Sequence, residues 1–540
     1  MLSVRPTLFR HPRIHLGSVG SPPVTGLLVL DGQVIAAGDA AGLASSSPTS
    51  LVVDLPGAAV VPGLIDAHIH SLSYARGLGE VDLRSSATLA ECLQRVADHA
   101  ARLAPDDWFT GGHWDSNRWD VAVQPDRHAL DTVTGSRPAI LDSLDGHTIW
   151  ANTAALAAAG IDADTPDPVG GEIVRDAGGS PTGILRETAC GLITTVAPAA
   201  TAERTVADLA AAQRRLLAFG VTAIHDIDGE DALAGYRTLH ARGALVVRVA
   251  KAIPYRALQA AIDEGRRTGS GDERLRTGPV KLFSDGALGS RTCHMCRPFT
   301  DTGTTGIAVM SEETLWEATA LALRNGIGVA THAIGDRANQ IVLDVYERAR
   351  HEGLLTDGLR VSIEHAQYLR PTDAHRLARL GVIASMQPTH CTTDWDLADR
   401  VLVGHDLLPY AWRSVLAAGG TLAFGSDAPI ESPNPFLALH AAVTRTRLDG
   451  TPPGGWRTQE AVSPAEALAA HTVGGARAIG RADDLGSLTP GHLADLVCVD
   501  TDPVPEATGD PAADRAAIDA IACTAVLGTW SAGELAFGSV

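Results

Sequence analysis

Between residues 58 and 486, short apolar stretches alternate with longer stretches rich in Ala, Leu and Arg. This pattern predicts buried parallel strands joined by crossover helices. The predicted strands are Ala59–Ile65, Val221–Ile224, Leu245–Ala250, Val280–Phe283, Gly328–Ala330, Val361–Ile363, Val382–Ser385 and Leu422–Phe424. The predicted helices include Val206–Phe219, Glu312–Asn325, Gln340–His351, Thr372–Leu380 and Pro409–Ala418. Eight strands with their helices form a (β/α)8 barrel of the TIM type, an α/β fold.

The two ends of the chain differ from this central part. Residues 1–57 and 487–540 consist of short apolar stretches separated by turns, and Asp31-Gly32 is typical of a hairpin. Each end is too short to build a core of its own. We therefore expect residues 1–57 and 487–540 to form one small composite β-sandwich domain, with residues 58–486 forming the barrel domain.

A long segment separates the first predicted strand from the second. A connection of this length is expected to be a folded insertion rather than a coil, so we predict an inserted subdomain at about 72–205. Placed after the first strand, it would cover the catalytic face of the barrel. Its aromatic residues could line a substrate pocket, although a private core is the favoured interpretation for most of them; they include Trp108, Trp114, Trp119 and Trp150.

Charge and hydropathy exclude some classes of partner. The formal net charge is -20, which argues against nucleic acid and anionic membranes, because both attract basic surfaces. No stretch has the length and apolarity of a membrane span, and the segment Met1–Pro6 lacks an apolar leader. We expect a cytoplasmic protein that acts on a small molecule. Cys293 and Cys296 form a C-x-x-C without a second pair, so two ordinary thiols are favoured over a zinc ribbon.

Polar residues follow several predicted strands at the point where each strand ends. His68 and His70 lie two residues apart, so on a strand both side chains point the same way. His332, His365 and Asp427 follow the fifth, sixth and eighth strands. Active sites of such barrels are built at the carboxyl ends of the strands, so these side chains should meet there. A lone His at a strand end is more often structural, but four imidazoles and a carboxylate predict a site for a metal such as zinc.

Lys281 is unusual because it lies inside the apolar strand Val280–Phe283. A buried ammonium is unfavourable unless it is paired, and a protonated amine cannot ligate a metal. One interpretation is an ion pair with an acid such as Asp285. The other is carbamylation by carbon dioxide, which would make Lys281 an anionic bridge between two metals. A lysine pKa lowered by burial would favour that reaction.

With these residues, a series of motifs resembles the metal-dependent amidohydrolase superfamily, and within it the YtcJ-like group that includes N-substituted formamide deformylases. The resemblance spans nearly the whole chain and implies a barrel with a composite β-sandwich. The motifs include residues 61–70, Asp145-Gly146-His147, Lys281–Arg291, His332–Asp336, Ile363–Gln367, Gly425–Pro429 and Gly491–Leu496. The combination in this order is specific for the group but not for a substrate.

The resemblance also implies roles for the predicted site residues. His68, His70 and Asp427 resemble ligands of a first metal, His332 and His365 those of a second, and Lys281 resembles the bridging carbamate. Some members use only one metal, so the resemblance allows either count. Asp427 would take the proton of a metal-bound hydroxide and pass it to the leaving amine.

Three further residues are candidates for contact with substrate: His147, Arg291 and His390. For His147 and Arg291 a packing role is an equal alternative. His225 and Asp226 end the second strand, and we expect them to support the site or simply to close the strand.

The resemblance favours a hydrolase of a non-peptide C–N bond, in an N-formyl amine, an N-acyl amine or a cyclic amide. An ester or other carbonyl hydrolase on the same metal site is the main alternative. A deaminase agrees less well with Lys281, and a metal-free structural relative agrees less well with the full set of six candidate ligands. No G-x-S-x-G motif supports a serine hydrolase. A homodimer is common in the superfamily, and we keep it as an expectation.

Overall fold

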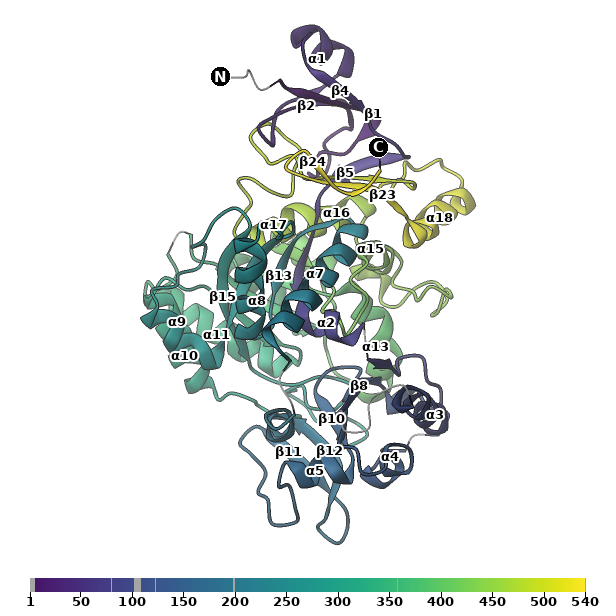
Figure 1. Ribbon diagram of the computed structural model, residues 1–540, viewed down its shortest axis with the longest axis vertical. Coiled ribbons are helices and arrows are strands. Elements are labelled where there is room, and N and C mark those ends of the chain that lie inside the picture. Colours follow the sequence, from purple (N-terminus) through teal and green to yellow (C-terminus); the bar gives the residue numbers. More distant parts are fainter. Residues whose placement is uncertain are drawn as a thin grey trace.

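A barrel occupies the centre of the molecule, between two further sheets (Figure 1). The computed structural model describes residues 5–78, 80–101, 108–121, 123–197, 200–356 and 358–539. The sheet built from the two ends of the chain lies at the top of the view and the insertion at the bottom. Residues 1–4, which belong to the segment expected to lack a leader, lie outside the described part. No helix of the described part is long and apolar enough to cross a bilayer.

Eight parallel strands pair in chain order around the barrel. Each predicted strand has its counterpart there, so the barrel prediction is confirmed. The strands are β6 (Leu64–Ile69), β13 (Val221–Asp226), β14 (Arg248–Pro254), β15 (Leu275–Phe283), β16 (Val329–Ala333), β17 (Val361–His365), β19 (Ile383–Met386) and β21 (Thr421–Phe424). Beyond the strands, Asp427 N–H donates to the His68 carbonyl at 2.7 Å and His70 N–H donates to the Ala428 carbonyl at 2.9 Å. These bonds join the last strand to the first at the mouth of the barrel.

The first predicted strand, Ala59–Ile65, is wrong in one respect. It is divided at Gly63 into β5 (Ala59–Pro62), which pairs with β22 (Leu496–Val499) in the terminal sheet, and β6, which belongs to the barrel. A Cβ on Gly63 would lie 2.2 Å from Thr222 Oγ1 and 2.9 Å from Asp495 Cβ. Only glycine therefore allows the chain to pass between the two sheets at this point.

Helices cover the outside of the barrel. They include α7 (Ala202–Ala218), α8 (Glu230–Ala241), α10 (Glu312–Arg324), α11 (Asp336–His351) and α12 (Asp373–Leu380). Two of these helices begin with a side-chain cap, Thr201 before α7 and Ser311 before α10.

Two helices differ from the prediction. The predicted helix Pro409–Ala418 begins only at Trp412, as α14 (Trp412–Ala417), because Leu408–Pro409 forms β20 and pairs with β18 (Tyr368–Leu369). The sequence analysis also missed α13 (Pro388–Val401), which starts directly after β19 with a proline in its first turn.

The two ends of the chain contribute strands to one sheet, which also includes β5, beyond the predicted boundary at residue 57. Its strand order is β24-β23-β22-β5-β1-β2-β3, with β4 beside β1. Phe9 of β1 packs edge-on against Trp530 of β23 at 6.3 Å between ring centroids, so the two halves enclose a common apolar core. The remaining bounds are β1 (Thr7–Ile14), β2 (Val24–Leu30), β3 (Gln33–Gly38), β4 (Leu51–Asp54), β23 (Val526–Ser531) and β24 (Glu534–Gly538).

The insertion is folded around a second sheet of six strands, in the order β11-β12-β10-β9-β8-β7. Trp114, Trp119 and Trp150 are buried in its own core, which confirms the private-core interpretation for them; Trp114 also lines a cavity facing the barrel. The strands are β7 (Val81–Asp82), β8 (Phe109–Trp114), β9 (Ala139–Ser143), β10 (Thr148–Ala151), β11 (Gly171–Arg175) and β12 (Pro181–Glu187).

We expect Gly63→Ala to destabilise the fold by about 1–3 kcal/mol, because the added methyl group overlaps Thr222 and forces the two sheets apart. Thermal melting followed by circular dichroism measures the loss. Gly38→Ala is the matched control, since a Cβ on Gly38 meets nothing within 4 Å. Equal melting temperatures for the two variants would show that the junction tolerates the side chain.

Candidate metal centre

The six predicted metal ligands all lie at the mouth of the barrel, on or directly after the ends of its strands. Lys281 is on β15, His332 on β16 and His365 at the last position of β17. His68 is on β6, His70 follows it, and Asp427 stands three residues after β21. Except for His70, which is partly accessible, all of these residues are buried.

Three of them converge most closely. Ligand atoms of His68, His365 and Asp427 lie within 4.8 Å of one another. Asp427 Oδ1 is 3.4 Å from His68 Nε2 and 3.6 Å from His70 Nε2. The His332 ring lies beside that of His365, at 4.6 Å between centroids. The cluster therefore combines His365 from the second predicted ligand set with His68 and Asp427 from the first.

Each of the four imidazoles has one nitrogen held by an oxygen from outside the cluster. His68 Nδ1 is 2.5 Å from Glu364 Oε2, and His365 Nδ1 is 2.8 Å from Gln387 Oε1. Such partners fix the tautomer and leave the second nitrogen available to a metal. In the same way, His70 Nδ1 lies 3.2 Å from Asp228 Oδ1 and His332 Nε2 lies 3.1 Å from the Gly286 carbonyl.

The sequence analysis did not assign Glu364, Gln387 or Asp228 to these roles. Glu364 and Gln387 stand next to predicted strand ends, but Glu364 contacts His68 on β6, a strand not adjacent to β17, and Gln387 contacts His365 on the adjacent β17. A sequence pattern does not reveal such partners. Behind them, His225 Nδ1 contacts the Ala67 carbonyl, and Asp226 pairs with Lys251 at 3.2 Å.

The electrostatics of the cluster suit a metal. Burial lowers the pKa of His68, His332 and His365 well below the usual value, and neighbouring cations lower it further. These imidazoles are therefore neutral at pH 7, which is the form that ligates zinc. Burial also disfavours the cation of His70, but the hydrogen bond and charge of Asp228 outweigh this and raise its pKa.

Asp427 and His365 are held in an unusual backbone conformation. Their φ angles are 57° and 74°, in the left-handed region that non-glycine residues rarely occupy. Asp66 stabilises the turn before Asp427, because its carboxylate accepts hydrogen bonds from Ser426 N–H at 2.9 Å and Ser426 Oγ at 2.6 Å. The contacts that shape this turn also direct the Asp427 carboxylate toward the cluster.

Lys281 does not pair with Asp285, so the predicted ion pair between these two residues is wrong. The Asp285 carboxylate accepts hydrogen bonds from three backbone N–H groups, those of His294, Ile334 and Gly335. Lys281 Nζ is instead 3.2 Å from His68 Nε2. Among the described residues, no carboxylate oxygen lies within ion-pair distance of it. Burial lowers the pKa of Lys281 to about 8.

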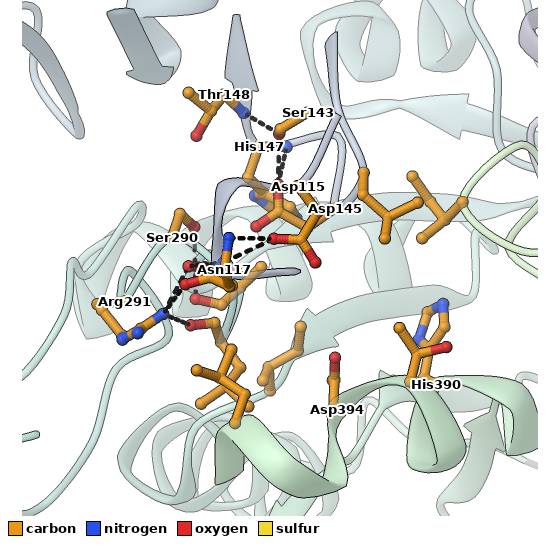
Figure 2. Close-up of a pocket in the computed structure, with 18 of the residues that line it drawn as sticks. Asp115, Asn117, Ser143, Asp145, His147, Thr148, Ser290, Arg291, His390 and Asp394 are labelled. Carbon is orange, nitrogen blue, oxygen red and sulfur yellow. Dashed lines mark hydrogen bonds between the residues drawn. The ribbon is translucent and has the colours of Figure 1, made fainter. Parts of the chain in front are cut away.

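The three candidates for substrate contact line a cavity between the barrel mouth and the insertion (Figure 2). His390 stacks on the ring of His365, and its Nε2 lies 3.8 Å from Asp427 Oδ2. His147 lies 5.3 Å from the His332 ring, and Glu187, 2.8 Å from its Nδ1, raises its pKa to about 9 against the effect of burial. Arg291 donates from Nε to Asp301 and from Nη1 to the Gly289 carbonyl, so most of its donors are used near its own loop.

Comparisons with known proteins agree with this arrangement. Residues 51–537 match the Amidohydrolase family model. The chain is 31% identical to the putative amidohydrolase YtcJ of Bacillus subtilis (strain 168), covering 85% of this chain and 87% of that protein. It is 31% identical to the N-substituted formamide deformylase of Arthrobacter pascens, covering 86% and 88%. A crystal structure of an uncharacterized metal-dependent hydrolase from Pyrococcus horikoshii OT3 is similar with a TM-score of 0.75 at 29% identity, covering 94% of this chain and 99% of that chain.

We expect Glu364→Gln to lower the affinity for zinc by about 10–100-fold, because the amide holds the His68 imidazole less firmly than the carboxylate does. Competition with a chelator of known affinity measures the change. Glu313→Gln, an exposed residue in the first turn of α10, is the control. Unchanged zinc affinity in Glu364→Gln would remove this orienting role.

Proposed function

Because this chain belongs to the amidohydrolase family, we propose that it hydrolyses a non-peptide C–N amide bond at a metal centre in the barrel mouth. The observation that supports this most strongly is the convergence of His68, His365 and Asp427, with their imidazoles neutral and oriented. An N-formyl or N-acyl amine is the proposed substrate class, by similarity to the formamide deformylase.

The donor set suits a divalent ion, which we propose to be zinc. Neutral imidazoles and a carboxylate are ligands that zinc accepts. His68, His70, His332, His365 and Asp427 would hold two ions with carbamylated Lys281, or one ion without it. When bound, such an ion lowers the pKa of a water molecule and polarises the carbonyl of the amide.

We propose that Asp427 carries out the proton transfers of the reaction. In hydrolysis, a water oxygen adds to the amide carbon, the C–N bond breaks and the nitrogen leaves with a proton. Asp427 lies between His68, His70 and His390 at the mouth of the cavity, so its carboxylate can accept the proton of the water and return it to the leaving amine. His390 and His147 line the same cavity and would contact the substrate.

The metal count distinguishes the two versions of the site. We expect two zinc ions per chain in protein purified without chelators and supplied with bicarbonate, and loss of one or both in Lys281→Ala. Elemental analysis measures the ratio of metal to protein. One ion that is indifferent to Lys281→Ala would favour the single-metal version, and no ion in the wild type would contradict the metal proposal.

Turnover tests the assignment of Asp427 and His68. On a panel of N-formyl and N-acyl amines with matched esters, we expect Asp427→Asn to lower kcat by about 10²–10⁴-fold, because the proton acceptor is lost. His68→Ala should abolish turnover together with metal binding. His128→Ala, whose side chain is 70% exposed on the insertion, is the control. Near-wild-type turnover in either site variant would overturn the assignment, and turnover of esters alone would replace the amide proposal.

A further inference from the structure

Four carboxylates that form no ion pair within the described residues line the cavity beyond the metal centre: Asp115 and Asp145 from the insertion, Asp394 from α13, and Glu431 after β21. Figure 2 shows Asp394 on its helix across the cavity from Asp115 and Asp145. The carboxylates are also close enough for their charges to interact. Burial raises the pKa of Asp394 to about 7, opposed by the charge of His390, and the charges of Glu431 and Asp115 raise it further.

Each of these carboxylates is held through one oxygen by uncharged donors. Asp394 Oδ2 accepts from the Tyr410 hydroxyl at 2.9 Å, and Glu431 Oε1 accepts from Thr393 Oγ1 at 2.7 Å. Asp115 Oδ1 accepts from the backbone and side chain of Asn117, and Asp145 Oδ1 accepts from Ser143 Oγ and His147 N–H. Within the described residues, the second oxygen of each has no hydrogen-bond partner, and none of the four forms an ion pair.

Each other charged group of the cavity either pairs with an opposite charge or, like Arg118 and Arg400, is exposed to water. Arg291 pairs with Asp301 at 2.9 Å, and Arg186 pairs with Glu172 at 2.8 Å. Asp396 pairs with Arg447 at 3.1 Å, and Arg400 donates to the Asp396 carbonyl. Arg118 lies on the exposed rim, where water screens its charge. The interior of the cavity therefore keeps a surplus of negative charge.

A buried acceptor in the same cavity also lacks a donor. Gln367 is 2% exposed, and its Oε1 has no hydrogen-bond partner within the described residues. The Gln367 Nε2 group lies 3.3 Å from His390 Nδ1. A buried acceptor without a donor is unfavourable, so this atom independently indicates a ligand that carries N–H groups.

A separate metal ion bound among these four carboxylates does not account for their arrangement. Within the described residues, only His68, His365 and Asp427 bring three ligand atoms within 4.8 Å of one another. The four carboxylates are spread more widely than a small metal ion requires. A group with several N–H donors, presented on a chain, suits such a spread arrangement better.

Helix α13 sets the distance between the two parts of the cavity. His390, beside Asp427, and Asp394 are four residues apart, so they share one face of the helix with a separation of about 6 Å along its axis. A substrate whose amide lies at Asp427 therefore reaches Asp394 through a linker of about four to six atoms.

Resting on the proposed function, we propose that the substrate carries a positively charged ammonium group, separated from the scissile amide by a short aliphatic linker. The ammonium donates to Asp394 and is attracted by the charges of Glu431, Asp115 and Asp145, while the amide lies at Asp427. Hydrogen bonds between an ammonium and carboxylates are charge-assisted and directional, so they select this class over neutral analogues of the same length.

Binding tests this inference without requiring turnover. 6-Aminohexanoate and heptanoate have the same length and carboxylate, and differ in an ammonium that replaces a methyl group. In calorimetry on the zinc-loaded full chain, we expect 6-aminohexanoate to bind about tenfold more tightly, as one charged hydrogen bond allows. Asp394→Asn and Glu431→Gln should each reduce this ratio by several fold.

The control is Asp399→Asn, which removes a charge from the same helix but lies outside the cavity, where Asp399 accepts from Trp456 Nε1. It should leave the ratio unchanged. Equal binding of the two ligands by the wild type, or an unchanged ratio in both cavity variants with wild-type melting temperatures, overturns the inference.

Turnover separates the two proposals. N-formyl-1,5-diaminopentane and N-formylhexylamine form the matched substrate pair, and we expect a higher kcat/KM for the first. If both are hydrolysed equally, the proposed function stands and the ammonium inference fails. If neither is hydrolysed but 6-aminohexanoate is still preferred, the amide proposal fails and the ammonium site stands.

Discussion

The closure of the barrel between β6 and the turn after β21 is the constraint on which the site depends. Asp427 N–H donates to the His68 carbonyl, and the Asp66 carboxylate holds Ser426 from the other side. A Cβ on Gly425 would lie 2.5 Å from His68 N, so the two segments approach as closely as their backbones permit. The contacts that complete the fold are therefore the contacts that set the distance between His68 and Asp427. Stability and site geometry cannot vary independently here.

Much of this arrangement could be predicted from the sequence, because a barrel strand has a local signature. Each apolar run predicts a strand, and a polar residue at its carboxyl end is expected at the mouth of the barrel. His332 and His365 could therefore be assigned to the mouth of the barrel without knowing their partners. The first strand was harder to delimit. Ala59–Ile65 is one apolar run, and its division at Gly63 follows from pairing with Leu496–Val499, more than 400 residues away. Local pattern carries no information about that partner.

The partners of Glu364 and Asp285 were not predicted, and the physical reason is the same for both. Glu364 supports His68 rather than its neighbour His365, and Asp285 accepts backbone N–H groups rather than the Lys281 ammonium. In both cases the partner was decided by which side of a strand or loop the residue faces in three dimensions. α13 was missed because no helix was predicted directly after the strand Val382–Ser385, although Pro388 suits the first turn of a helix. His390 was therefore predicted without the helix that presents it.

The cavity is lined by barrel strand ends on one side and by the insertion and α13 on the other. The chemistry lies on strand ends, where a shift would disturb the barrel, whereas Asp115 and Asp145 lie on loops of the insertion and Asp394 on α13. Loops can change with little effect on the barrel core, so the same metal centre can serve different substrates when the surrounding residues differ. For this reason, similarity to a formamide deformylase supports the reaction more strongly than the substrate. The charges of the cavity belong to this chain itself, so they indicate a class of substrate, which family membership does not.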